Sequence, residues 1–255
     1  MKRNLGCRAC GFGLAALVAF SASLASAQTA EEVIDMSIKA QGGREALSSV
    51  KSVQRTGEMF VDGAFGQMEG TMEVAMVPGK KAYQSMDLGV FQQESGFDGE
   101  VAWQTGMAGI EKLEGERAAQ IKQAVSLNPF IGMLDAGAKA EKLDDETVDE
   151  VEYFVIQMTP PDGEPLKMYV EKETGFAKRM TRTMNNPMFG EVEMIIETTD
   201  YAEFGSIKLP TFQHLVMGEQ LEVDTEFTET KVDEELDESI FAMPEADPAP
   251  SSDAP

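Results

Sequence analysis

The chain has very few residues of several chemically distinctive kinds, and each scarcity excludes a class of function. Its 255 residues include one histidine, one tryptophan and two cysteines, and 21 lysines and arginines face 45 aspartates and glutamates. A single histidine excludes a two-histidine metal site and the common zinc signatures. A formal net charge of −24 argues against nucleic acid and anionic membrane surfaces, which are bound by basic patches. We therefore expect neither a metal ion nor a nucleic acid as ligand.

The first 27 residues have the pattern of a secretory signal peptide. The segment starts with basic residues, continues with a short apolar run at positions 11–20, and ends in small residues at Ala27, just before Gln28. The apolar run is too short to span a bilayer, and no later stretch is long and apolar enough to do so. We expect cleavage between Ala27 and Gln28, and an exported, periplasmic or secreted product that is soluble and has no integral membrane segment.

Both cysteines, Cys7 and Cys10, belong to this segment. The exported chain would therefore contain no cysteine and no disulfide, and its stability would come from its core, which its length permits. Cys7 precedes the apolar run, whereas the lipid-acceptor cysteine of a lipoprotein follows it at the cleavage point. We therefore expect a released protein without a lipid anchor.

Residues 28–244 are predicted to form one domain that begins with helices. Residues 30–40 have an approximate apolar stripe, and Thr29 and Glu32 have the spacing of a capping box. A second short helix is expected over residues 44–50. Residues 245–255, rich in proline, alanine, serine and aspartate, are predicted to be a disordered tail.

From Val53 onward the hydrophobic period changes to two, which indicates strands. Ten or eleven strands follow one another through hairpin-length connections, one of them at Asp98-Gly99. Such a series predicts a mainly β (α+β) protein with one large antiparallel sheet, curved or closed into a half-open barrel.

One segment in the middle of the chain interrupts the strands. Residues 116–127 have helical spacing, Asn128-Pro129 is expected to end that helix, and residues 130–134 are expected to form an apolar loop. Two interpretations fit this segment. It could belong to the ordinary core and cover one mouth of the sheet, or it could be a movable lid or plug on a cavity.

Catalytic constellations are nearly absent. His214 alternates within a predicted strand, no nucleophile-elbow motif occurs, and a structural histidine is favoured. The acidic clusters at 144–146 and 233–238 lie in predicted turns without EF-hand spacing, so solvated loops are favoured over weak calcium sites. We expect no enzymatic activity and no cofactor, with a carboxylate-dependent hydrolase as a remote alternative.

Methionine is the positive signal. Sixteen methionines follow residue 27, against eleven leucines, although leucine is normally among the commonest residues. Methionine is flexible and suits surfaces that adapt to varied apolar partners. A methionine-rich core and an apolar cavity that receives acyl chains both fit this pattern. The candidate cavity residues are Met59, Met72, Val74, Met76, Met86, Trp103, Ile121, Val125, Phe130, Met133, Met158, Met168, Met180 and Met194. Three further methionines, Met68, Met184 and Met217, also fall on predicted strands. Trp103 fits a core anchor equally well.

Several short motifs occur in a distinctive order: Ala40-Gln-Gly-Gly43, Phe97-Asp-Gly99 with Ala102-Trp103, residues 169–175, Lys208-Leu-Pro210 and residues 239–244. In this order the chain resembles exported bacterial proteins of the outer-membrane lipoprotein-sorting type, with a LolA-like fold, from residue 29 to 244. The resemblance implies an eleven-stranded half-open barrel whose helices cover an apolar cavity for the acyl chains of lipoproteins. It also implies an arginine that latches a helical lid, for which Arg55 in the first strand is the nearest candidate.

Three hypotheses about function follow. The leading one is a periplasmic, non-enzymatic carrier of lipid or lipoprotein acyl chains, with release through opening of residues 116–134. The second is a binding or sensing module that recognises an apolar ligand or an envelope protein partner without transporting it. The third is the carboxylate-dependent hydrolase. In each case a monomer is expected.

Overall fold

The computed structural model describes residues 28–64, 66–106, 109–123, 125–161, 163–186 and 190–245. The predicted signal peptide, with its cysteines and its cleavage site at Ala27, and the tail beyond residue 245 lie outside the described residues. Within these ranges no helix combines the length and the apolar character needed to cross a membrane.

The described chain contains two helices at its start, two in its middle and sixteen strands. The helices are α1 (Ala30–Ala40), α2 (Gly43–Ser49), α3 (Gly115–Gln123) and α4 (Pro129–Asp135), with a 3₁₀ helix η1 (Glu238–Phe241) near the end. The strands are β1 (Val53–Gly63), β2 (Gly66–Val77), β3 (Lys81–Asp87), β4 (Gln92–Phe97), β5 (Ala102–Gly106), β6 (Gly109–Leu113), β7 (Lys139–Lys142), β8 (Glu146–Val148), β9 (Val151–Thr159), β10 (Leu166–Glu171), β11 (Ala177–Asn186), β12 (Gly190–Thr198), β13 (Tyr201–Phe204), β14 (Ile207–Pro210), β15 (Phe212–Met217) and β16 (Leu221–Val232).

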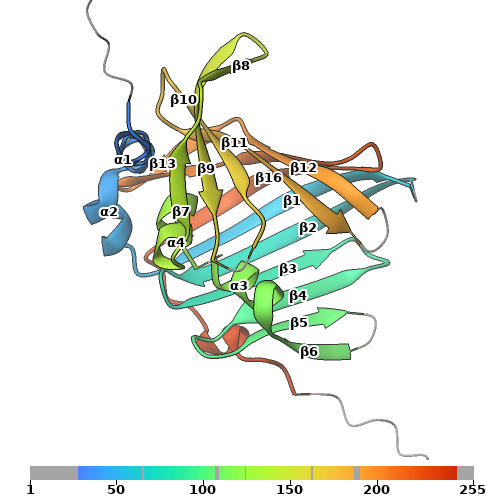
Figure 1. Cartoon of the computed structure of the whole chain (residues 1–255). Helices are drawn as coiled ribbons and strands as arrows, with labels where there is room; N and C mark the ends of the chain where they lie inside the picture. The colour runs from blue at the N-terminus through green and yellow to red at the C-terminus, as the bar shows by residue number, and fades with distance from the viewer. Residues whose placement is uncertain are drawn as a thin grey trace, which may run out of the picture.

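Fourteen of these strands form one antiparallel sheet. Its order is β6-β5-β4-β3-β2-β1-β16-β15-β12-β11-β10-β9-β7, with β8 paired to β9, while β13 and β14 form a separate pair. The sheet is strongly bent, and α3 and α4 lie over one side of it (Figure 1). Its end strands β6 and β7 do not pair with each other, so the barrel stays open. The predicted fold class is confirmed.

The number of strands exceeds the predicted eleven for two reasons. Three short strands, β6, β7 and β8, lie in stretches without a clear period of two. The predicted strand at 207–217 is divided into β14 and β15, and β13 begins at the last residue of the predicted strand at 190–201. The division between β14 and β15 follows Pro210, which has no amide N–H to donate to a neighbouring strand. The next residue donates instead to a loop, with Thr211 N 2.8 Å from Asp200 O.

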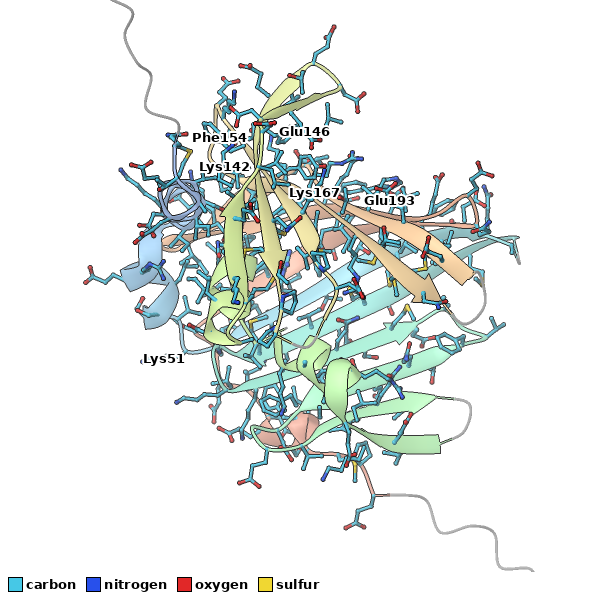
Figure 2. The ribbon with its side chains drawn as sticks, viewed as in Figure 1. Lys51, Lys142, Glu146, Phe154, Lys167 and Glu193 are labelled. Atoms are coloured by element: carbon cyan, nitrogen blue, oxygen red, sulfur yellow. The ribbon has the colours of Figure 1, made fainter. Side chains whose placement is uncertain are left out.

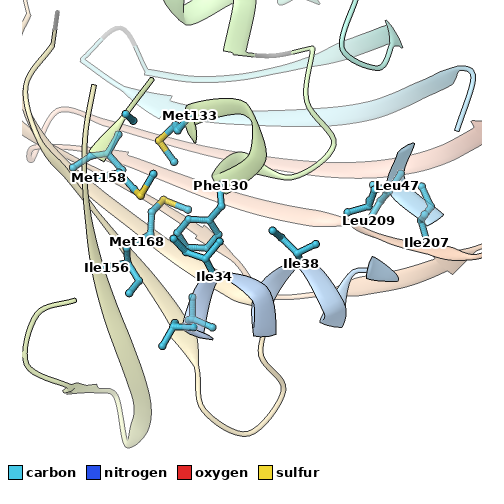
Figure 3. Packing of buried hydrophobic residues seen from close by; sticks show 14 of the residues in the cluster. Ile34, Ile38, Leu47, Phe130, Met133, Ile156, Met158, Met168, Ile207 and Leu209 are labelled. Atoms are coloured by element: carbon cyan, nitrogen blue, oxygen red, sulfur yellow. The ribbon is translucent and has the colours of Figure 1, made fainter. Parts of the chain in front are cut away.

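The two helices predicted at residues 30–40 and 44–50 are confirmed as α1 and α2. Thr29 Oγ1 accepts a hydrogen bond from Glu32 N at 3.2 Å, and Glu32 Oε2 accepts one from Thr29 N at 2.9 Å, which is the capping box. The helix α1 buries Ile34 and Ile38 in the largest apolar cluster of the protein. In that cluster Phe130 of α4 lies between α1 and the methionines of β9 and β10 (Figure 3).

The prediction for residues 128–134 was wrong. Asn128-Pro129 begins a helix and does not end one, because Asn128 is the N-cap of α4 and Pro129 occupies its first turn. Asn128 Oδ1 accepts hydrogen bonds from Phe130 N at 3.0 Å and Ile131 N at 3.1 Å. The preceding helix α3 ends at Gln123, earlier than expected.

The Asn128 side chain also fixes α4 to the rest of the fold. Its Nδ2 donates to Gln41 Oε1 at 2.6 Å, and Gln41 Nε2 donates to Lys208 O at 3.4 Å. Asn128 is 1% exposed. Two buried amides, Asn128 and Gln41, therefore join the start of α4, the end of α1 and strand β14.

We expect Asn128→Ala to lower the free energy of unfolding by about 2 kcal/mol, because it removes a helix cap and removes the donor to the buried Gln41 Oε1. Urea unfolding followed by circular dichroism measures this loss. Thr29→Ala, at the exposed cap of α1, is the matched control and should cost about 1 kcal/mol or less. Equal losses in the two variants would contradict the bridging role of Asn128.

Candidate functional site

All eleven methionines predicted on strands lie on one face of the main sheet. Residues directly opposed in antiparallel strands point to the same side of a sheet, so the register assigns each side chain to a face. One unbroken row of opposed residues crosses eight strands, from β9 to β2: Ile156, Met168, Met180, Ile196, Leu215, Val223, Val61 and Met68. The other strand methionines belong to parallel rows on the same side: Met59, Met72, Met76, Met86, Met158, Met184, Met194 and Met217. We call this side the methionine face.

The opposite face carries the acidic side chains of β1, β2, β12 and β16. Glu58, Glu69, Glu73, Glu193, Glu222 and Glu226 alternate with the residues of the methionine face along their strands. Glu193 is labelled among the side chains of Figure 2. His214 also lies on this face, with Nδ1 2.6 Å from Asp224 Oδ1, its partner across the strand pair. The acidic character of the chain is therefore displayed away from the methionine face.

A cavity of about 370 Å³ opens on the methionine face beneath the start of α4. We call it the arginine cavity because three arginines occur in its lining. The lining residues are Gln41, Val53, Arg55, Val74, Met76, Ser126, Leu127, Pro129, Met133, Leu166, Met168, Ala177, Arg179, Met180, Arg182, Ile196, Thr198, Tyr201, Leu209, Pro210 and Gln213. Its volume is within the usual range for small-molecule sites, which are mostly apolar with a few polar groups.

Arg55 lies on one wall of the arginine cavity, in β1. Its guanidinium carbon is 3.4 Å from the centre of the Phe227 ring, Nη2 donates to Pro210 O, and Nε is 3.4 Å from Thr230 Oγ1. Burial lowers the pKa of Arg55 to about 10, so it stays charged at neutral pH. Its partners are an aromatic ring, a carbonyl and a hydroxyl, and none of them carries a negative charge.

The other two arginines come from β11 and differ from each other. Arg179 forms an ion pair with Glu197, its partner across the strand pair on the acidic face. Arg182 lies opposite Met194, in the row next to Met180, and therefore on the methionine face. No ion pair joins Arg182 to a carboxylate among the residues that the structure describes.

A second, larger cavity of about 710 Å³ lies between α2, α4 and the turn after β2. It adjoins the arginine cavity. We call it the helix cavity. Its lining includes Leu47, Pro78, Phe97, Lys122 and Ile131. Ser126 and Leu127 line both cavities, so the segment between α3 and α4 separates them.

Five of the fourteen predicted cavity residues line the arginine cavity, and five others lie elsewhere on the methionine face. Val74, Met76, Met133, Met168 and Met180 line the arginine cavity together with Arg55. Met59, Met72, Met86, Met158 and Met194 lie on the methionine face outside that lining.

The remaining candidates from residues 116–134 lie in three different places. Val125 lines the helix cavity. Ile121 packs on the small cluster of Ala102, Leu113 and Ala118. Phe130 is fully buried in the main core. Residues 116–134 therefore contribute both to the core and to the walls of cavities. This agrees with the core interpretation and with the lid interpretation of the segment.

Trp103 lies on the face opposite the methionines and lines neither cavity, as the core-anchor interpretation expects. In β5 it is opposed to Gly96, which is opposed to Tyr83, whereas the neighbouring Ala82 pairs with Met76. The indole is 1% exposed, and Nε1 donates to Phe241 O at 2.8 Å. A Cβ on Gly96 would come within 2.7 Å of the indole ring, so only glycine fits beneath it. Trp103 anchors η1 to the back of the sheet.

Arg55 is not a latch for the central helices in this conformation. Its hydrogen bonds go to Pro210 of β14 and Thr230 of β16 and not to α3 or α4. Arg182 was missed by the sequence reasoning, although its signal is simple. It alternates with Met180 and Met184, and the period of two puts all three on one face.

The acidic clusters are mostly exposed, as expected of solvated loops, and several of their carboxylates also have partners. Lys142 and Lys172 contact Asp145 at 2.5 and 2.9 Å. Burial opposes ionisation of Asp145, but the hydrogen bonds from the two lysines prevail and lower its pKa. Glu146 accepts from Lys167 Nζ and Tyr169 OH, both at 3.1 Å, above the sheet (Figure 2).

The second acidic cluster also has structural partners. Asp233 Oδ1 accepts from Lys51 N at 2.6 Å, and Asp237 caps η1. In both clusters the carboxylates hold loops and strand ends in place.

Comparison with known proteins gives fold-level similarity. No family model matches the chain, and no curated protein matches it. Among solved structures, a LolA superfamily protein from Nitrosomonas europaea is 12% identical, with a TM-score of 0.60 over 85% of this chain and 98% of that one. A DUF1329 family protein from Desulfovibrio piger is 11% identical, with a TM-score of 0.59 over 85% and 98%. A domain described as that of an outer-membrane lipoprotein-sorting protein from Vibrio parahaemolyticus is 11% identical, with a TM-score of 0.57 over 83% and 97%. The chain has the LolA-like fold.

The single tryptophan gives a spectroscopic test of the two faces. Because Trp103 is buried on the side opposite the methionines, we expect its fluorescence to resist acrylamide. It should also resist fatty acids brominated along the chain, which quench only on contact. Strong quenching by a brominated fatty acid, while circular dichroism shows an intact fold, would contradict this assignment of faces.

Proposed function

We propose that this protein is an exported, periplasmic carrier that binds lipid or lipoprotein acyl chains against the methionine face and in the arginine cavity. The observation that carries the proposal is the gathering of all eleven strand methionines on the side of the sheet that α4 covers. Flexible thioether side chains adapt to the irregular shape of bound alkyl chains. The likeness to a LolA superfamily structure and a lipoprotein-sorting domain supports the same use of the fold.

The exposure of the methionines suits an open binding surface. Met158 and Met168, near α4, are almost fully buried and belong to the core. Met72 and Met86, farther along the strands, are only half-buried. Transfer of apolar surface from water stabilises a complex by about 0.8 kcal/mol for each CH₂ group that is covered, so an acyl chain laid along this face would be retained.

Release of the bound ligand would depend on the segment between α3 and α4. The stretch between α3 and α4 forms the wall between the two cavities, and Gly79 N donates to Val125 O at 2.8 Å to hold it against the turn after β2. Displacement of this wall would join the arginine cavity to the helix cavity. Transfer to an acceptor protein or membrane through that opening distinguishes a carrier from a sensing module.

Co-purification tests the binding of lipid directly. We expect the protein, expressed with its leader and isolated from the periplasm, to carry lipid that native mass spectrometry detects and organic extraction releases. The stripped protein should then bind a fluorescent fatty acid and pass it to acceptor vesicles faster than free diffusion of the probe allows. The absence of both co-purifying lipid and fatty-acid binding would reject the proposal.

A pair of double variants tests which face binds. We expect Met76→Gln with Met180→Gln to weaken fatty-acid binding roughly tenfold, because two amides then lose water without gaining partners. The control is Glu73→Gln with Thr183→Gln, on the same two strands but on the acidic face, and it should leave affinity unchanged. Equal affinities in the two double variants would place the ligand elsewhere.

A further inference from the structure

The arginine cavity combines an apolar lining with a positive charge that no described lining residue neutralises. Among the described residues that line it, none is aspartate or glutamate, although the whole chain has 45 of them. Arg179 is paired with Glu197, whereas Arg55 and Arg182 have no carboxylate partner among the described residues. An uncompensated cation is costly next to apolar surface unless something of opposite charge accompanies it.

The two arginines come from different parts of the sheet. Arg55 is in β1 and Arg182 in β11, with β16, β15 and β12 between them. Both strands contribute to the wall of one cavity, and the sheet between them is strongly bent (Figure 1). Met76 and Met180 line the same cavity, so alkyl-binding and anion-binding groups lie within one volume.

Arg55 is held ready for such a ligand. Phe227 supports one side of its guanidinium, and Pro210 O and Thr230 Oγ1 accept from Nη2 and Nε. A guanidinium has five N–H donors, so donors remain for a further acceptor. The fork of donors matches the oxygens of carboxylates and phosphates, and hydrogen bonds to such ions are about twice as strong as neutral ones.

We propose that the ligand of this cavity is an anionic amphiphile, whose carboxylate or phosphate group binds between Arg55 and Arg182 while its alkyl chain lies along the methionine face. This inference rests on the proposed function and narrows it. Neutral acyl lipids would leave both arginines without a counter-charge. The shared chemistry is a monoanionic or dianionic oxygen head on an alkyl chain, and carboxylate and phosphate heads are distinguished by the test.

The test compares three probes with the same C16 chain: hexadecanoate, hexadecyl phosphate and the neutral hexadecanol. Each displaces the uncharged dye N-phenyl-1-naphthylamine from the delipidated full chain, below the concentration at which the probes form micelles. We expect at least one anionic probe to bind about tenfold tighter than hexadecanol, the size of a hydrogen bond to a charged group. The stronger of the two anions identifies the head group.

Substitutions assign this preference to the arginines. Arg182→Met should lower the preference for the anion several-fold and leave hexadecanol affinity unchanged, and adding Arg55→Met should abolish the preference. Arg117→Met is the matched control, because Arg117 pairs with exposed Glu111 at 2.8 Å and lines neither cavity. If Arg55→Met fails to fold by circular dichroism, the Arg182→Met result decides alone.

The outcomes separate the two proposals. Hexadecanol binding as tightly as both anions, or an anion preference that survives Arg182→Met and the double variant, overturns the anionic ligand and leaves the carrier proposal standing. Failure of all three probes to displace the dye or to bind by native mass spectrometry overturns both. A preference that falls in Arg182→Met and persists in Arg117→Met supports the anionic ligand.

Discussion

The side-chain period of two within one continuous antiparallel sheet is the constraint on which the rest of this structure depends. Neighbouring strands hold each other in register, so a shift of one residue in any strand would move its methionines to the acidic side. Because the pairing continues from β6 to β7, with bulges in the β1–β16 and β10–β11 pairs, the register sorts the strands of the main sheet into an apolar and an acidic face. The cavity, the covering helices and the surface charge all follow from that sorting.

The two interpretations of the methionines, as core and as binding surface, describe different regions of the same face. Near α4 the methionines meet Phe130 and Ile34 and are sealed from water. Farther along the strands, side chains such as Met72 and Met86 stay half-buried. The flexibility that makes methionine a poor specifier of a tight core is tolerated because aliphatic and aromatic residues on α1 and α4 complete the packed end. The open end can then adapt to a ligand without unfolding the sheet.

The sequence alone could predict the strands and helices that have a clear hydrophobic period. It could not predict the elements and side-chain orientations that depend on contacts with distant parts of the chain. The alternation of Met72 and Val74 with Thr71 and Glu73 identifies a strand with an apolar and a polar side. The strands β7 and β8 are too short to show a period, and they exist because β9 offers them backbone partners. Asn128-Pro129 carries signals for both a helix end and a helix start, and the choice depends on Gln41, 87 residues earlier. Trp103 required knowledge of the strand pairing, since either side of β5 could bury an indole.

The distribution of charge links fold and function. The acidic face keeps a strongly anionic chain hydrated and soluble, but it also repels anions that approach in solution. Charges on an outer surface mainly affect the rate of encounter, whereas a buried and hydrogen-bonded charge mainly affects how long a ligand stays. Arg55 and Arg182 lie on the apolar side, where water screens them less. An amphiphile would therefore be drawn in by its alkyl chain and retained by its head group. A surface of this kind selects for ligands that have both parts, because an ion without a chain gains too little from entry and a chain without an ion leaves two arginines without a counter-charge.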